Sequence, residues 1–215
     1  DPLDLNRYPT VRYVSLTGAH VPPFISWGTA AHDIQSAIDA AAVGDTVRVT
    51  NGVYSTGGAV TPGASLMNRI VVTNAITVTS VNGPEGTTIL GQGPLGNNAV
   101  RCAYVANGAI LSGFTLSHGF TRASWDTARN CAGGGAYLDE ALVVNCTITG
   151  NSALEGGGTY GSRVSSSVVL GNEAMIGPNF VGGEYTGSYT WPDPGGVGNT
   201  VIDITQPWWT YATVS

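Results

Sequence analysis

The side chains best suited to acid–base chemistry gather in one short segment of the sequence. His118, Arg122, Asp126 and Arg129 all fall within twelve consecutive positions. An imidazole and a carboxylate can transfer protons, and guanidinium groups stabilise developing negative charge. We therefore take these four residues as the candidates for catalysis. The competing interpretation, which we favour, is a solvated loop in which arginine and aspartate pair with each other.

Composition limits the classes of protein that this sequence can represent. The chain has 215 residues, of which 42 % are apolar and only 10 % charged, and its formal net charge is −6. This length suits one domain with a sizeable core. An acidic chain argues against a nucleic-acid-binding surface, which is usually basic, and we find no apolar run long enough for a membrane span. Because the sequence opens at Asp1 rather than methionine, we expect a processed protein that is secreted or displayed at the cell surface.

The cysteines and acidic residues give little support for a metal site. Cys102, Cys131 and Cys146 lack the spacing of metal ligands, so we expect small core residues among which one disulfide at most can form. Calcium needs about six to eight oxygen ligands, whereas the acidic residues are scattered along the chain. We therefore expect no cofactor and leave calcium as the only metal to consider.

Two adjacent segments of the sequence nearly repeat each other. The glycine triplet at 133–135 returns at 156–158, a step of 23 residues, and a Gly-Asn-x-Ala phrase at 150–153 returns at 171–174, a step of 21. Short strands and small turn residues at such a period are typical of a solenoid, in which each repeat forms one coil. The repeat predicts that the following residues stack in successive coils: Tyr137 over Tyr160, Ile148 over Val169, and Asn151 over Asn172.

Small residues mark the predicted corners of these coils. Gly134 and Gly157 would let neighbouring corners approach closely. Asn151 and Asn172 would adopt the left-handed backbone of a sharp corner and bond to each other along the stack. Residues 114–117 also align with residues 146–149, at a step of 32, so residues 119–130 should form a longer turn. Three of the four catalytic candidates lie in that turn, where solenoids often carry function.

An amphipathic helix is predicted before the repeats. Ile34, Ala37, Ile38 and Ala41 recur at helical spacing, which indicates a helix over residues 29–42 that ends before Gly44. The run that follows, TVRVT at 46–50, alternates as a strand. We expect three parts: an N-terminal arm, strand and capping helix at 1–45, solenoid coils at 46–185, and a C-terminal segment at 186–215.

The segment TAAHDIQSAIDAAAVGDTVRVTNGVYSTGG at 29–58, together with the glycine-rich repeats, resembles secreted bacterial right-handed parallel β-helix proteins of the pectate-lyase-like superfamily. The resemblance covers roughly residues 11–200 and implies an all-β chain with an N-terminal amphipathic capping helix. It says little about function, because the superfamily includes lyases, hydrolases and adhesins.

The resemblance implies two enzyme activities, polysaccharide lyase and glycoside hydrolase. Such lyases use a lysine or arginine base and acidic calcium ligands, but this chain has no lysine. At the 23-residue step, the adjacent acids Asp139 and Glu140 would stack near Ser162 and Arg163, respectively. Glu140 and Arg163 would then form an ion pair between coils, which is not a calcium site. We see no pair of carboxylates for glycoside hydrolysis, although folding can bring distant ones together.

The C-terminal segment is rich in aromatic residues and nearly uncharged, which predicts a cap or an assembly contact. These residues are Trp191, Trp208, Trp209 and Tyr211. Tryptophan also stacks on sugars, and an uncovered solenoid end invites pairing with another chain. The sequence thus predicts a structural or adhesive module that self-associates head to tail into fibres or binds an extracellular glycan. The alternatives are the two enzymes and a carbohydrate- or ice-binding solenoid. Ice binding is suggested by hydroxyl pairs that could form an outward row, at 77/79, 115/117 and 147/149.

Overall fold

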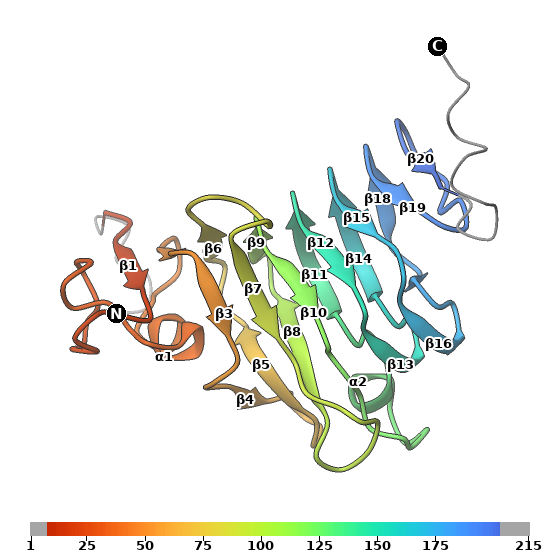
Figure 1. The fold of residues 1–215 in the computed structure, drawn as a ribbon, viewed down its shortest axis with the longest axis horizontal. Helices are drawn as coiled ribbons and strands as arrows, with labels where there is room; N and C mark the ends of the chain where they lie inside the picture. Colours follow the sequence, from red (N-terminus) through yellow and green to blue (C-terminus); the bar gives the residue numbers. More distant parts are fainter. Residues whose placement is uncertain (1–7, 203–215) are drawn as a thin grey trace.

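The computed structural model describes residues 8–202, which fold as a right-handed parallel β-helix with two short helices (Figure 1). The coils stack along the long axis of the molecule, from β1 at the N-terminal end to β20 at the other. Successive coils pair in parallel, whereas β4 pairs antiparallel with β5. The predicted fold class is therefore confirmed.

Two long sheets and one short sheet form the faces of the solenoid. The eleven-stranded sheet contains β1 (Val11–Val14), β2 (Thr46–Val49), β4 (Ala59–Val60), β5 (Met67–Val72), β6 (Thr77–Ser80), β8 (Val100–Ala106), β9 (Ile110–Ser112), β11 (Ala136–Val144), β14 (Thr159–Ser165), β17 (Phe180–Val181) and β18 (Glu184–Thr186). The seven-stranded sheet contains β3 (Gly52–Tyr54), β7 (Thr87–Leu90), β10 (Thr115–Ser117), β12 (Thr147–Thr149), β15 (Val168–Val169), β19 (Tyr189–Thr190) and β20 (Thr200–Val201). A two-stranded sheet joins β13 (Ser152–Glu155) to β16 (Glu173–Ile176).

Inward-facing side chains form two apolar columns that run through the stack. In the larger sheet the paired residues are Val47, Val78, Leu111, Val143, Val164 and Tyr185. In the smaller sheet they are Tyr54, Ile89, Leu116, Ile148 and Val169. All of these side chains are buried. Burial of each one contributes about 1.5–3 kcal/mol, so alternation along every strand builds one continuous core.

The stacking predicted from the repeats is confirmed. Tyr137 pairs with Tyr160, Ile148 pairs with Val169, and the amide of Asn151 bonds to that of Asn172. Thr115 also lies opposite Thr147, as the alignment at a step of 32 residues requires. Sequence repeats in this chain therefore report directly which residues are neighbours between coils.

The backbone at the asparagine corners differs from the prediction. The left-handed residues are Gly150 and Gly171, each with φ of +66°, and the asparagines that follow them are outside this region. Asn151 and Asn172 instead act through their buried side chains. Glycine takes the strained backbone because it has no Cβ, which frees the asparagine to point inward.

Gly134 and Gly157 lie where coils approach each other closely. A Cβ on Gly134 would stand 2.6 Å from the carbonyl oxygen of Ser152. A Cβ on Gly157 would overlap the carbonyl oxygens of Glu173 and Pro178. The backbone here packs against backbone, which leaves no space for a side chain.

The N-terminal helix is shorter than predicted. Helix α1 spans Ile34–Asp39, and its N-cap Asp33 has an extended backbone and accepts a 2.8 Å hydrogen bond from the Ser36 N–H. Residues before Asp33 do not join the helix, because Ala31 forms a parallel bridge to Val14 of β1. Ile34, Ala37 and Ile38 are buried against the first coils. The helical spacing thus identified the buried face, whereas strand pairing set where the helix begins.

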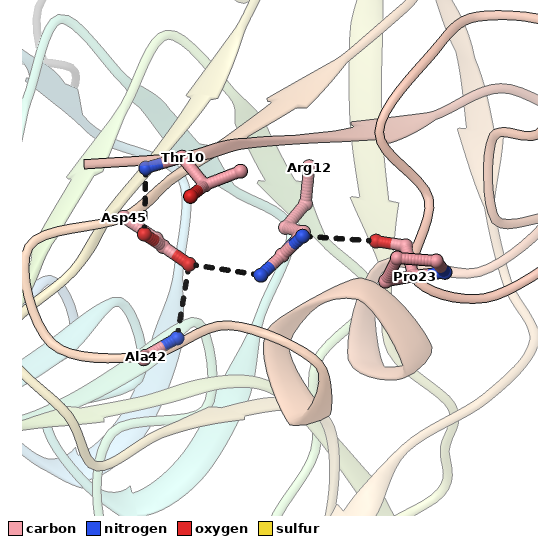
Figure 2. Close-up of polar contacts among 5 residues, drawn as sticks. All are labelled: Thr10, Arg12, Pro23, Ala42 and Asp45. Atoms are coloured by element: carbon pink, nitrogen blue, oxygen red, sulfur yellow. Dashed lines mark hydrogen bonds and ion pairs between the residues drawn. The ribbon is translucent and has the colours of Figure 1, made fainter. Parts of the chain in front are cut away.

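A buried carboxylate ties the N-terminal segment to the first coil (Figure 2). Asp45 accepts hydrogen bonds from the backbone N–H groups of Thr10, at 2.7 Å, and Ala42, at 3.1 Å. It also pairs with Arg12 at 3.3 Å, and the same guanidinium donates to the carbonyl of Pro23. The pair therefore joins β1, the loop before α1 and the turn before β2.

Strands of the end segments continue the sheets of the predicted central part. β1, from the segment 1–45, pairs in parallel with β2. β19 and β20, from the segment 186–215, extend the smaller sheet. Both end segments therefore contribute strands to the sheets of the central part.

The threonine-containing triplets do not form one row. β6 belongs to the larger sheet, while β10 and β12 belong to the smaller one. The neighbour of Thr115 in the preceding coil is Thr88, and the row Thr88, Thr115 and Thr147 ends at Val168. The motif alone does not show which face a strand occupies, and residues 77–79 lie on a different face from the other two triplets.

Candidate functional site

The long turn is held in place by a buried asparagine. It contains helix α2 (Ala128–Cys131), and the side-chain oxygen of Asn130 accepts hydrogen bonds from the backbone N–H groups of Ser65 and Leu66. The Asn130 amide donates to Asp126 at 2.8 Å, and the Thr127 N–H donates to the same carboxylate. The Thr127 hydrogen bond and then the Asn130 one lower the pKa of Asp126. Asp126 is therefore an ionised residue that orders its own loop.

The four catalytic candidates have separate surroundings. Arg122 donates to the side-chain oxygen of Asn97 at 2.7 Å, and Arg129 pairs with Asp139 at 3.4 Å. His118 lines a different hollow, beside Phe120 and Glu173. Across residues 8–202, no hydrogen bond or ion pair joins two of the four side chains. Proximity in sequence therefore did not produce a bonded cluster of these groups. The charge of Arg122 adds only a minor contribution to the lowered pKa of Asp126, after the hydrogen bonds from Thr127 and Asn130.

A buried arginine lies beneath the long turn. Arg101 is fully buried, and all of its guanidinium N–H groups have acceptors: the carbonyls of Arg129, Ala132 and Gly133, and the side chains of Thr61 and Asn68. Burial lowers the pKa of Arg101 to about 9. Our sequence analysis missed this residue, because nothing in the local pattern distinguishes a buried arginine within a strand.

Three tyrosines stack on the outer face of β8, β11 and β14. The ring centroids of Tyr104 and Tyr137 are 5.5 Å apart, and those of Tyr137 and Tyr160 are 5.1 Å apart, with nearly parallel planes. The Arg101 guanidinium carbon lies 5.3 Å from the Tyr137 centroid. Tyr104 extends the predicted tyrosine pair by one coil. The stack carries phenol groups along this face next to the Arg129–Asp139 pair.

A charged hollow adjoins this face at an irregularity in the strands. It has a volume of about 530 Å³ and is lined by Glu140, Ser162, Arg163, Gly183 and Glu184. Glu140, Arg163 and Glu184 are exposed and come from three successive coils. In the part of the chain that the structure describes, the Arg163 guanidinium makes no hydrogen bond or ion pair. The hollow is thus lined by an arginine whose guanidinium donors have no partner among the described residues, together with two glutamates.

The strand register beside this hollow shows that the predicted pairing of Glu140 with Arg163 was wrong. The register shifts between Leu138 and Leu142, so that Leu142, rather than Glu140, lies opposite Arg163. Glu184 is the neighbour of Arg163 in the next coil. The sequence held a signal for this shift, since the repeat step falls from 23 residues at the tyrosines to 21 at the asparagines.

The cysteines are free and buried. Burial raises the pKa of Cys102 to about 12 and that of Cys146 to about 11. Within residues 8–202, we find no cluster of histidine, cysteine, aspartate and glutamate that could hold a metal ion. Over the same residues, no helix has the length and apolar character needed to cross a membrane.

The predicted aromatic contacts of the C-terminal segment are only partly described. Trp191 is partly buried, and its carbonyl accepts a hydrogen bond from the side chain of Asn179. Trp208, Trp209 and Tyr211 lie outside the described residues.

Comparison with known proteins gives a fold but no family. Neither a scan of family models nor a search of curated proteins finds a match to the sequence. Among solved structures, pectin methylesterase PemA from Erwinia chrysanthemi is similar, with a TM-score of 0.51 and 14 % identity. The alignment covers 85 % of this chain and 55 % of that protein, so this chain spans about half the length of the protein it matches. The fold of this chain is thus that of the parallel β-helix proteins to which the esterase belongs.

Proposed function

We propose that this chain is a structural and adhesive β-helix module that acts outside the cell and binds an extracellular glycan at the charged hollow. The observation that carries the proposal is the position of Arg163 between Glu140 and Glu184 on three successive coils. A guanidinium donates hydrogen bonds to sugar oxygens, and carboxylates accept them from sugar hydroxyls. The volume of about 530 Å³ is in the range of small-ligand sites.

The contacts of the long turn favour binding over cleavage. Arg122, Asp126 and Arg129 each bond to neighbouring loop or strand groups. Arg101 beneath them bonds to three backbone carbonyls. These polar side chains thus hold the long turn against the solenoid. A turn held in this way is a rigid support beside a recognition surface.

Glycan binding can be measured by titration calorimetry with soluble fragments of extracellular polysaccharides, both acidic and neutral. We expect Arg163→Ala to weaken binding about tenfold, because the central donor is lost. Arg48→Ala is the matched control, since Arg48 is an exposed arginine on β2, and three strands of the larger sheet, β6, β9 and β11, separate β2 from β14. Equal affinities for the Arg163 variant and the unchanged chain would contradict the proposal.

Polysaccharide cleavage is the second candidate function. It is favoured by the two carboxylates, Glu140 and Glu184, that line the same hollow, because glycoside hydrolysis commonly uses a pair of acids. The assay is release of reducing ends from the glycans that bind, with Glu140→Gln and Glu184→Gln as variants. Arg122→Ala and Arg129→Ala test the long turn in parallel. Cleavage that is lost only in the glutamate variants would make the hollow an active site.

Self-association would use the C-terminal end of the solenoid. Near that end, Met175, Ile176 and Val197 are 76 %, 51 % and 81 % exposed. Exposed apolar side chains favour contact with a second copy. Light scattering and electron microscopy of the purified chain, with and without residues 208–215, measure this assembly. A monomer at all concentrations would exclude the fibre.

A further inference from the structure

A second hollow lies near the N-terminal end of the solenoid, many coils from the charged one. It has a volume of about 650 Å³ and forms between the loop after β1 and the corners that follow β2 and β6. Its lining residues are Ser15, Leu16, Thr17, Trp27, Thr50, Asn51, Val81 and Asn82. None of these side chains carries a charge, in contrast to the hollow around Arg163.

Trp27 supplies a preformed aromatic surface. Its side chain is 42 % exposed, although it packs edge to face against Tyr13 with ring centroids 4.4 Å apart. The loop that carries it is fixed by the hydrogen bond from Arg12 to the Pro23 carbonyl (Figure 2). The Ala30 N–H also donates to the Trp27 carbonyl. A ring held in this way loses little conformational entropy when a ligand stacks on it.

Two stacked corner amides supply the polar part of the hollow. The amide nitrogen of Asn82 donates a 2.8 Å hydrogen bond to the side-chain oxygen of Asn51. Among the described residues, the other amide oxygen and the other amide nitrogen of this pair have no partner. The pair therefore leaves an amide oxygen that can accept and an amide nitrogen that can donate, and sugar hydroxyl groups can both donate and accept hydrogen bonds.

The orientation of this pair is set by the backbone of the solenoid. Both asparagines precede a glycine, at Asn51-Gly52 and Asn82-Gly83, and these corners lie in consecutive coils. The Asn51 amide lies against Gly86, where an added Cβ would stand 3.0 Å from the Asn51 side-chain carbon. Packing against Gly86 thus places the Asn51 amide, and the hydrogen bond to Asn51 places that of Asn82.

We propose that this N-terminal hollow binds a neutral saccharide, with the apolar face of one sugar ring on Trp27 and its hydroxyls on the Asn51–Asn82 pair. An exposed aromatic ring beside amides and hydroxyls fits the two faces of a sugar, one apolar and one polar. The lining residues include no cation to pair with a carboxylate, so the site favours neutral sugars over uronates. The inference does not depend on the proposed role of the charged hollow.

The test is titration of the full chain with three neutral hexaoses, of β-1,4-linked glucose, mannose and galactose, and with a hexagalacturonate. At least one neutral hexaose should bind and should perturb tryptophan fluorescence. Trp27→Ala should weaken that binding about tenfold. Trp125→Ala is the matched control, since Trp125 is another exposed tryptophan, at 52 %, in the long turn.

Asn82→Ala keeps the test valid if Trp27→Ala disturbs the loop, because Asn82 is exposed and its side chain makes one hydrogen bond among the described residues, the one to Asn51. It should also weaken binding, whereas Arg163→Ala should leave it unchanged. The last result separates this site from the charged hollow. The inference is overturned if none of the neutral hexaoses binds, if hexagalacturonate binds there more tightly, or if both the Trp27 and Asn82 variants bind normally.

Discussion

Asn151 donates a 2.9 Å hydrogen bond from its side-chain amide to the side-chain oxygen of Asn172, which lies one coil further along the stack. Asn172 donates in turn to the side-chain oxygen of Asn179 at 3.0 Å. Each oxygen also accepts from a backbone N–H, including that of Gly119 onto Asn151. The ladder thus satisfies buried backbone groups at a corner where the chain leaves the smaller sheet.

Replacing one member of this ladder should destabilise the fold. Asn172→Ala removes the acceptor of the Asn151 N–H and the donor to the carbonyls of Ile148 and Leu170. We expect the free energy of unfolding in urea to fall by about 2–3 kcal/mol, because buried groups lose their partners. Asn98→Ala is the control and should change it by less than about 0.5 kcal/mol, because Asn98 is exposed and its side chain makes no hydrogen bond among the described residues.

A methyl group at a close backbone contact should also be costly. Gly157→Ala places a Cβ against the carbonyl oxygens of Glu173 and Pro178, so neighbouring coils must separate. The expected loss in unfolding free energy is about 2–3 kcal/mol. Gly28→Ala is the comparison, since its nearest neighbour is a side-chain atom 3.9 Å away. Similar stabilities for the two variants would refute close packing at the corner.

The buried guanidinium of Arg101 should not be replaceable by lysine. An ammonium group offers fewer donors and lacks the planar fork, so carbonyls of Arg129, Ala132 or Gly133 would lose their partners. We expect Arg101→Lys to lower stability by about 2–3 kcal/mol and to speed proteolysis within residues 119–132. Arg48→Lys on the exposed surface controls for the change of residue type. Unchanged proteolysis of the long turn would show that Arg101 does not anchor it.

Alkaline pH should weaken the fold through the buried thiols. Burial raises the pKa of Cys146 to about 11 and of Cys102 to about 12, whereas thiols in the unfolded chain ionise near their ordinary value of 9.0. Above about pH 9 the folded state therefore holds more thiol protons, and stability falls as pH rises. Burial also lowers the pKa of Arg101 and of Arg69, and these two groups act in the opposite direction. The raised pKa values of Cys131 and Tyr185 act together with the two thiols, so the groups that lose stability as pH rises outnumber the two arginines.

Urea unfolding at pH 8, 9 and 10 measures this dependence. The double variant Cys102→Ala, Cys146→Ala should lose stability less steeply over this range, since two of the responsible groups are gone. The stability of the variant at pH 8 measures the effect of the two substitutions on core packing, and the changes at higher pH are compared with that value. Parallel pH profiles for the variant and the unchanged chain would assign the effect to other groups.

The sequence by itself determined the solenoid and the identity of its stacked residues. Repeats report neighbours between coils, because parallel pairing in register brings like positions together, as at Tyr137 and Tyr160. Alternation likewise determined the apolar columns that contain Val143 and Ile148. These features are local or periodic, so pattern alone is enough to identify them.

The tertiary structure decided where the polar side chains meet. The shift between Leu138 and Leu142 moved Glu140 away from its expected partner and opened the charged hollow with Glu184. The N-terminal hollow joins Trp27 to two corners far along the chain, and Arg101 finds its acceptors in loops outside its own strand. Such sites depend on the exact path of turns and bulges. A shift of one or two residues redirects a side chain, and a repeat pattern records only the average step.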